Sequence, residues 1–311
     1  MPTKVPLMIK RKTPPIVKVS IDGRCAKLNK TDGTSTAMYL FHLLSSSLIM
    51  KPRNSISSNI PAFKAIRIDE IVINDYDKAI YSVWRALLTE TNRFIELIED
   101  TPLNIEEWRV QKRIYDEEGS RYSLKLGFAA FYLNRTNRSG ILSNAGPIGG
   151  FDQMGNYLID ARFNRQELVR RICEIAKHKS KIHLYNKDIR MFLEKYMPKY
   201  QERAFIYFDP PYYNKGKALY KNFFSPLDHQ EIFKHISALS CPWLVTYDDV
   251  PEIREIYSSY VGKRYDLTYS LANNGKKSEL MFLSDDSLWP NEAELKERQI
   301  SINLRGEDNG E

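Results

Sequence analysis

Short apolar runs alternate with amphipathic segments along most of the chain, and this rhythm constrains its fold more than any other feature. Runs rich in β-branched and aromatic residues predict buried strands. They lie at Asp69–Asp75, Lys181–Asn186, Ala204–Phe208, Trp243–Tyr247, Tyr265–Ser270 and Leu280–Ser284. Helical spacing predicts helices at Tyr81–Leu88, Gln166–His178 and Asp228–Leu239. This alternation predicts an α/β fold with a mainly parallel sheet and helices on both faces.

Three aspartates fall where the predicted strands end. Asp75 and Asp209 end or directly follow apolar runs, and Asp188 comes shortly after a third run. In open parallel sheets, ligands bind at the carboxyl ends of the strands, so these carboxylates are candidates for a binding site. Aspartate is also a favoured helix N-cap, and the spacing alone leaves that alternative open for Asp75 and Asp188.

The stretch between the first helix and residue 165 has a different character. From Thr89 to Ser123 the pattern is helical and charged, with a break at Thr101-Pro102. Phe128–Leu133 is an aromatic-rich run that leads into a polar, glycine-laden stretch from Asn134 to Gly155. That composition predicts a loop or hairpin rather than core.

The two ends of the chain lack the α/β rhythm. Ordered α/β signals begin near residue 69, and residues 31–66 fit neither the helix period nor the strand period. Residues 285–311 carry eight acidic and three basic side chains. We expect this acidic tail to be a mobile or marginally helical extension.

Composition excludes several classes of protein. The 311 residues include no run of eighteen apolar residues, so no membrane span is predicted, and the first residues lack the features of a secretion signal. Three widely spaced cysteines argue against a disulfide framework or a zinc cluster, and they suit a reducing cytoplasm. The net charge of +7 becomes +12 without the acidic tail, which is compatible with a polyanionic partner.

The most specific motif is the apolar run Phe205–Phe208 followed by Asp209, Pro210, Pro211 and Tyr212. The two prolines fix the backbone and supply no amide donor, so the turn presents acceptors rigidly. The Asp209 carboxylate and the Pro210 carbonyl suit the two N–H groups of an aromatic amine, whose lone pair they would aim at an electrophilic methyl group. Tyr212 offers a ring face for a flipped base. The alternative is a rigid turn with no catalytic role.

These motifs, with others in the same order, resemble the Dam-like family of adenine-specific N6 DNA methyltransferases. The resemblance runs from about Asp69 to Ser284. It includes Ile71–Asp75, Tyr132–Arg135 with Asn137–Gly140, Asp209–Tyr212, Phe224–His229 and Ser278–Leu280. It implies S-adenosylmethionine as cofactor and double-stranded DNA as partner, and it is compatible with a cognate restriction endonuclease that acts separately.

The resemblance also implies a domain organisation. The fold would be a Rossmann-like class I methyltransferase sheet with an inserted helical and hairpin region that recognises DNA. The catalytic domain would comprise residues 67–88 and 165–286, and the recognition insertion residues 89–164. Residues 1–66 would form an atypical N-terminal segment, and residues 287–311 the acidic tail.

The resemblance assigns roles to individual residues. Asp209, Pro210, Pro211 and Tyr212 would be catalytic. Asp75 would bind the cofactor ribose, Asp188 the cofactor adenine, and Asp209 would also lie in the cofactor site.

DNA contacts would come from Asn134, Arg135, Asn137 and Arg138, because arginine and asparagine suit base edges and phosphates. A solvated loop is the alternative. His229 is expected to be structural, since direct methyl transfer needs neither a histidine nor a metal.

One family feature is not visible in the sequence. Family members carry an aromatic-x-Gly-x-Gly loop before the ribose acid, but this chain has no glycine between Gly33 and Gly119. The segment Gly23–Leu28 resembles another glycine motif only faintly. Either the N-terminal sixty-odd residues are translated out of frame or otherwise degenerate, which we favour because residues 31–66 are poorly patterned, or the chain has a divergent cofactor loop.

The leading hypothesis is therefore an S-adenosylmethionine-dependent methyltransferase that acts on a flipped adenine in DNA. An RNA amino-methyltransferase is an alternative, because similar Asp-Pro-Pro-Tyr turns occur there. A non-catalytic DNA-binding remnant is a third hypothesis, motivated by the missing glycine loop.

Overall fold

The computed structural model describes residues 16–20, 70–117, 121–200, 202, 204–214, 224–267, 277–289 and 304–305. Side chains are described for these residues except 16–20, 265–267, 277–278 and 304–305. The predictions for residues 31–66 and for most of the acidic tail therefore lie outside the described residues.

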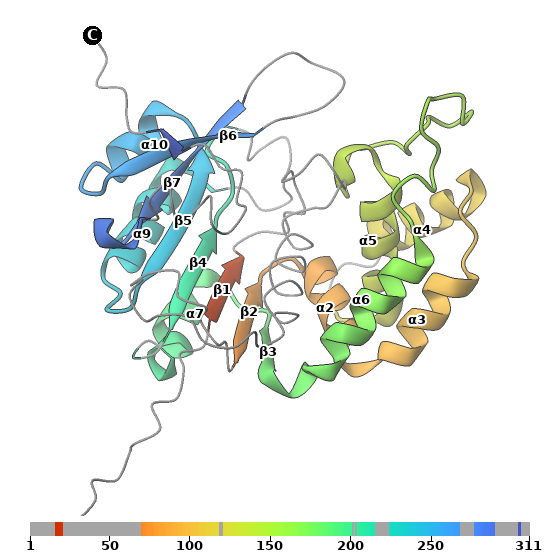
Figure 1. Ribbon diagram of the computed structural model, residues 1–311, viewed down its shortest axis with the longest axis horizontal. Helices are drawn as coiled ribbons and strands as arrows, with labels where there is room; N and C mark the ends of the chain where they lie inside the picture. Colours follow the sequence, from red (N-terminus) through yellow and green to blue (C-terminus); the bar gives the residue numbers. More distant parts are fainter. Residues whose placement is uncertain are drawn as a thin grey trace, which may run out of the picture.

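The described strands form one sheet in the order β3-β2-β1-β4-β5-β7-β6-β8 (Figure 1). They are β1 Ile16–Ser20, β2 Ile71–Asp75, β3 Ile182–Tyr185, β4 Phe205–Asp209, β5 Trp243–Asp248, β6 Gly262–Leu267, β7 Lys277–Leu283 and β8 Leu304–Arg305. The pairs from β3 across to β5 are parallel, whereas β7 runs antiparallel to both β5 and β6. The predicted α/β fold with a mainly parallel sheet is confirmed.

Two strands correct the predictions for the chain ends. β1 lies at the centre of the sheet between β2 and β4, so the prediction that ordered α/β structure begins near residue 69 is wrong. Its sequence, Ile-Val-Lys-Val-Ser, is short and has Lys18 in its middle. Buried parallel strands usually form continuous apolar runs, and this segment therefore gave no strong signal. In the acidic tail, β8 pairs with β6 and is a strand, not a helix.

Helices cover both faces of the sheet. They are α2 Lys78–Thr89, α3 Thr91–Asp100, α4 Ile105–Glu117, α5 Leu124–Thr136, α6 Arg165–Lys177, α7 Ile189–Lys195, α9 Pro226–Ser237 and α10 Pro251–Ile256. In β2, Ile71 and Ile73 join one apolar cluster with α2 to α6, and Val72 joins a second cluster with α7, α9 and α10. In Figure 1, α2 to α6 form the group beside the sheet on the right. The expected boundary between residues 88 and 89 thus falls at the last residue of α2, inside this cluster of helices.

The polar stretch after the aromatic run begins later than predicted. Ser123 caps α5 through the amide of Leu126, and the helix continues to Thr136, so the prediction that a loop begins at Asn134 is wrong. Asn134 and Thr136 are buried but hydrogen-bonded, to the carbonyls of Gly140 at 2.9 Å and Tyr132 at 2.8 Å. Composition alone does not show whether a polar residue lies in a loop or is buried in a helix with its hydrogen bonds satisfied.

Within the described residues, no helix is long and apolar enough to cross a membrane. The same part of the chain holds no cluster of three or more potential metal ligands.

Candidate active site at the carboxyl ends of the strands

The Asp-Pro-Pro-Tyr motif lies at the end of a central strand. Ile206 and Phe208 are fully buried and anchor β4 in the sheet, and Asp209 is its last residue. The strand ends there because the two prolines that follow have no N–H to donate to a neighbour. Asp209 is 7% exposed, and Tyr212 is half-buried. The motif is therefore a rigid turn next to the core.

Two acidic residues from neighbouring strands hold the turn in place. The amides of Tyr213 and Asn214 donate to the Asp248 carboxylate, at 2.8 and 3.2 Å, and Asp248 ends β5. The Tyr212 hydroxyl donates to Glu279 on β7. Neither acid has a role in the site that the sequence predicts. Glu279 lies within the Ser278–Leu280 motif, and Asp248 directly follows the apolar run of β5, which is the signal that identified Asp75.

Strand register places Asp75 and Asp209 at the same level of the sheet. Ser20, the last residue of β1, pairs with Asp75 on one side and with Asp209 on the other. Two strand spacings of about 4.8 Å separate the two aspartates, so their Cα atoms lie roughly 10 Å apart. The two carboxylates therefore flank the end of β1.

Asp75 does not cap the helix that follows it. That role belongs to Asp77, whose side chain accepts from the amides of Ala79 and Ile80 at 2.7 and 3.2 Å. Asp75 is 3% exposed, and its carboxylate accepts from the Asp77 amide at 2.9 Å. The capping alternative for Asp75 is wrong.

Two asparagine amides join the ends of β2 and β3. Asn74 is fully buried; its side chain donates to the Lys187 carbonyl and accepts from the Lys187 amide, both at 3.0 Å. Asn186 donates to the carbonyls of Asp75 and Tyr76, at 2.7 and 3.0 Å. These bonds fix the position of Asp75 relative to the start of α7.

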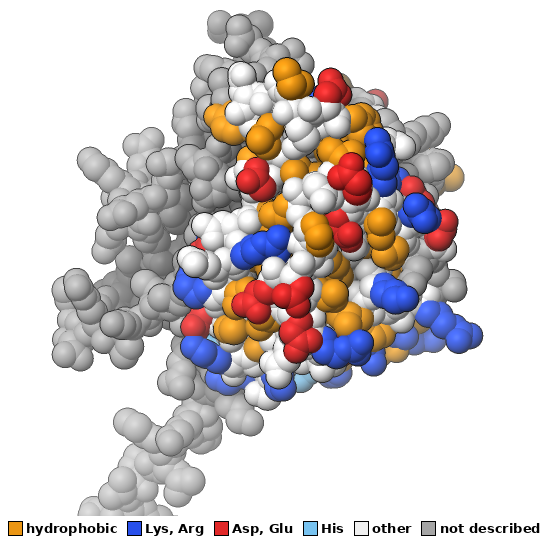
Figure 2. Space-filling view, turned by 90° about the vertical axis from the view of Figure 1, so that its right-hand side faces the viewer, with side chains coloured by type: hydrophobic (Ala, Val, Ile, Leu, Met, Phe, Trp, Pro, Cys, Tyr) orange, Lys and Arg blue, Asp and Glu red, His pale blue; other side chains and the backbone are white. Residues whose placement is uncertain are grey.

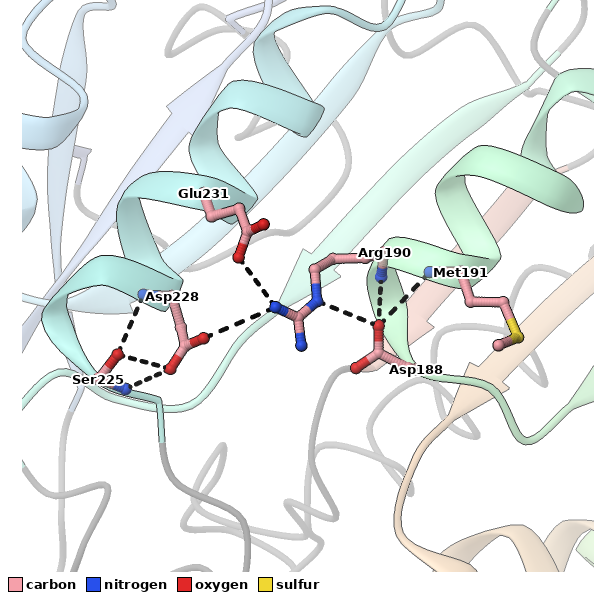
Figure 3. A network of polar contacts seen from close by, with 6 residues as sticks. All are labelled: Asp188, Arg190, Met191, Ser225, Asp228 and Glu231. Atoms are coloured by element: carbon pink, nitrogen blue, oxygen red, sulfur yellow. Dashed lines mark hydrogen bonds and ion pairs between the residues drawn. The ribbon is translucent and has the colours of Figure 1, made fainter.

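Asp188 caps α7 and belongs to a charged network. It accepts from the amides of Arg190 and Met191 at 2.9 and 3.4 Å, so its capping role is established. The Arg190 guanidinium contacts Asp188 at 3.3 Å and Glu231 of α9 at 2.9 Å (Figure 3), and these two carboxylates raise the pKa of Arg190.

Arg190 also lies 3.9 Å from Asp228 in the capping box of α9. Hydrogen bonds from Ser225 lower the pKa of this carboxyl. The network thus links the end of β3 to the first helix described after the Asp-Pro-Pro-Tyr turn.

His229 is buried, with 1% exposure, and its Nδ1 lies 3.2 Å from the Tyr247 hydroxyl. Its ring packs against Tyr213 with 5.0 Å between centroids. This agrees with the structural role predicted for it.

The four candidate DNA-contacting residues are not equivalent. Asn134, Arg135 and Asn137 are 4%, 3% and 0% exposed, whereas Arg138 is exposed. Asn137 accepts from the Trp108 indole and donates to the Ile141 carbonyl, both at 2.6 Å. The structure therefore places only Arg138 of these four at the surface.

The predicted hairpin in this region is real but short. Asn137 and Pro147 form an antiparallel bridge, and the Arg138 amide donates to the Gly146 carbonyl at 3.0 Å. The Ile148 amide donates to the Thr136 carbonyl at 2.8 Å.

The carboxylates at the strand ends suit the groups of S-adenosylmethionine. Asp75 and Asp188 offer acceptors for ribose hydroxyls and an adenine amine, and Asp209 provides negative charge for the region that would face a sulfonium. The described residues thus fit this cofactor.

The fold is an α/β sheet, and its candidate site lies at the carboxyl ends of the parallel strands. The model of the D12 class N6 adenine-specific DNA methyltransferase family matches residues 58–271. Since this match covers more than half of the chain, the protein belongs to that family.

Other comparisons are more distant. No curated protein matches the chain. Among solved structures, protein LPL1258 from Legionella pneumophila is 12% identical, with a TM-score of 0.34 over 96% of this chain and 91% of that one. The rRNA methyltransferase AviRa from Streptomyces viridochromogenes is 10% identical, with a TM-score of 0.31 over 89% of this chain and 80% of that one. Scores this low do not define a shared fold.

Proposed function

We propose that this protein transfers a methyl group from S-adenosylmethionine to N6 of an adenine that is flipped out of double-stranded DNA. The observation that carries the proposal is the register of Asp75 and Asp209 across β1. It supports a class I methyltransferase sheet in which the ribose acid and the amine-binding turn lie on either side of the central strand.

The proposed chemistry rests on positioning. When bound, S-adenosylmethionine supplies an electrophilic methyl group. The Asp209 carboxylate and the Pro210 carbonyl accept the two N–H groups of adenine N6, which favours a pyramidal nitrogen and directs its lone pair. The Tyr212 ring stacks on the base, and Glu279 and Asp248 hold this turn in place. Asp75 binds the ribose, and Asp188 uses its remaining acceptor capacity for the adenine.

Residues 89–164 are proposed to recognise DNA, with Arg138 as a direct contact. Asn134, Arg135 and Asn137 support that surface from within. The exposed Arg138 beside the short hairpin favours a nucleic-acid substrate over a small molecule. An RNA substrate remains the second candidate, and the shared chemistry of the Asp-Pro-Pro-Tyr turn is what supports it.

The test is Asp209→Ala, with Asp286→Asn as a control, because Asp286 is an exposed carboxylate in a 3-10 turn after β7. Transfer of labelled methyl groups to genomic DNA, and to total RNA in parallel, should fall on the order of 10²–10³-fold in Asp209→Ala, with DNA affinity retained. Asp286→Asn should match the wild type. Substantial activity in Asp209→Ala would rule out the assigned role. Methylation of RNA alone would favour the second candidate, and wild-type DNA binding without methyl transfer would favour a non-catalytic remnant.

A further inference from the structure

A pocket lies at the edge of the sheet, between α2 and β3. Its volume is about 340 Å³, which falls within the range of roughly 300–1,000 Å³ for small-molecule sites. Its walls come from α2, from the 3-10 turn Lys179–Lys181 and from β3, the last described strand on this side of the sheet. None of the residues assigned to the proposed active site lines it.

The pocket and the proposed active site are at opposite ends of the strands. Ile182, in the wall of the pocket, is the first residue of β3 and pairs with Ile71, the first residue of β2. Asp75 is the last residue of β2, and a strand of this length spans roughly 13 Å between its ends. In Figure 1, the connection from α6 to β3 lies at the end of the sheet away from the arrowheads of β1 and β4. A ligand in the pocket would therefore leave the cofactor site open.

The lining of the pocket combines apolar walls with two cations. Leu88, Ile182 and Leu184 supply aliphatic surface, whereas Arg85 and Lys179 supply positive charge. Apolar walls with a few polar groups are typical of small-molecule sites, in which the polar groups fix the orientation of the ligand.

Arg85 is held in place without a carboxylate. Its guanidinium donates to the Tyr81 hydroxyl at 3.2 Å and lies over the Tyr122 ring, 4.6 Å from the centroid. A guanidinium has five N–H donors, so most of them are left for a ligand. Because the side chain is already ordered, binding through it costs little further side-chain freedom.

The elements that form the pocket contain no acidic residue. This holds for α2, for the 3-10 turn and for β3. Lys177 pairs with Glu174 at 2.6 Å, whereas no described residue forms an ion pair with Arg85 or Lys179. Figure 2 shows Lys and Arg side chains gathered along the lower edge of the molecule, the level at which the α6–β3 connection lies in Figure 1. The local field therefore favours an anionic ligand.

We propose that this pocket binds a small organic anion, with an apolar body against the aliphatic wall and a carboxylate or phosphate group at Arg85 and Lys179. The fork of an arginine matches both oxyanions. The hydroxyls of Tyr81 and Ser180, which also line the pocket, add further donors. This site is separate from the proposed methyl transfer.

The test is calorimetry on the full chain with 2-naphthoate and 2-naphthyl phosphate as probes. The neutral 2-naphthamide and inorganic phosphate serve as comparisons. The naphthyl anions should bind at least about tenfold more tightly than either comparison, since the amide lacks the charge-assisted hydrogen bonds and inorganic phosphate lacks the apolar body. Binding of only one of the two anions would also support the site and would identify its oxyanion.

Matched variants locate the bound anion. Arg85→Gln and Lys179→Gln should each weaken binding at least about fivefold, whereas Lys177→Gln should match the wild type, because Lys177 is exposed, is paired with Glu174 and does not line the pocket. Lys179 is exposed, so its replacement leaves the fold intact.

Four outcomes would overturn the inference. They are a wild type that binds neither anion, equal binding of the neutral amide, equal losses in Lys177→Gln and Lys179→Gln, and displacement of the anions by S-adenosylmethionine. The third would indicate attraction by general surface charge, and the last would place the anions in the cofactor site. None of these measurements depends on methyl transfer, so failure here would leave the proposed function standing.

Discussion

Replacing Asn137 by alanine tests whether the polar segment at the end of α5 has a structural or a DNA-contacting role. The side chain has no solvent exposure. Its oxygen accepts from the Trp108 indole and its nitrogen donates to the Ile141 carbonyl, both at 2.6 Å. Asn137→Ala therefore removes both bonds at once, and it leaves the buried Trp108 indole donor and the partly buried Ile141 carbonyl without these partners.

The expected loss follows from these two bonds. Leaving a buried polar group unsatisfied costs about 1–3 kcal/mol, so two such groups would cost roughly 2–6 kcal/mol. A water molecule admitted to the space of the lost carboxamide would satisfy part of this demand. We therefore expect the free energy of unfolding to fall by about 2–4 kcal/mol.

Urea unfolding followed by tryptophan fluorescence measures this loss, and Arg138→Ala is the matched comparison. Because Arg138 is exposed, its replacement should change stability by less than about 0.5 kcal/mol and act on DNA affinity instead. Trp108→Phe removes only the indole donor, so it and Asn137→Ala should be non-additive in a double-mutant cycle. An Asn137→Ala variant with wild-type stability and weakened DNA binding would refute the structural interpretation.

Three further changes test the packing and the site. Gly127→Ala should lower the urea midpoint, because the added Cβ would lie 2.6 Å from a main-chain oxygen of α2. The cost of overpacking, roughly 1–3 kcal/mol, outweighs the gain in helix propensity of about 1 kcal/mol. A higher midpoint would contradict this. Arg190→Ala should weaken S-adenosylmethionine binding in calorimetry several-fold with little effect on stability, since its ion pairs are largely exposed; an unchanged affinity would leave Asp188 as a helix cap alone. Glu279→Ala should reduce kcat more than DNA affinity, because the Tyr212 hydroxyl loses its acceptor; an equal loss in both would show that Glu279 supports the fold generally.

Elements with a strong period are predictable from this sequence. The run Ala204–Phe208 differs by one residue from β4, and the apolar spacing around Tyr81–Leu88 falls within α2. These elements bury their apolar faces in the core, so the spacing of apolar residues in the sequence matches the pattern of buried residues in the structure. β1 lacks a clear apolar pattern, since its five residues include a lysine. Its central position is evident only from its pairing with β2 and β4.

The sequence predicts a site residue only where the residue's position along its own strand is enough to place it at the carboxyl ends of the sheet. Asp75 and Asp209 end their strands, so the rule for parallel sheets locates them. Asn74 and Glu279 act through partners far away in the sequence, Lys187 and Tyr212. Such contacts depend on the order of the strands in the sheet. The sequence alone does not reveal this order.

Because β1 lies at the centre of the sheet, the residues that directly follow it become candidates for the cofactor-binding loop. A ligand at the carboxyl ends of the strands is approached by the residues that directly follow β1, and Gly23 is the third residue after Ser20. If a divergent loop binds S-adenosylmethionine, Gly23→Val should weaken that binding, because a side chain would prevent close backbone approach. Micromolar affinity needs roughly 8 kcal/mol, and hydrogen bonds to Asp75, at about 0.5–1.5 kcal/mol each, do not supply it alone. Calorimetry of the wild type and of Gly23→Val separates the two interpretations. Tight wild-type binding that the variant loses identifies a divergent loop, and an absence of wild-type binding supports a degenerate N-terminal segment. Tight binding that Gly23→Val leaves unchanged would refute the role assigned to this glycine.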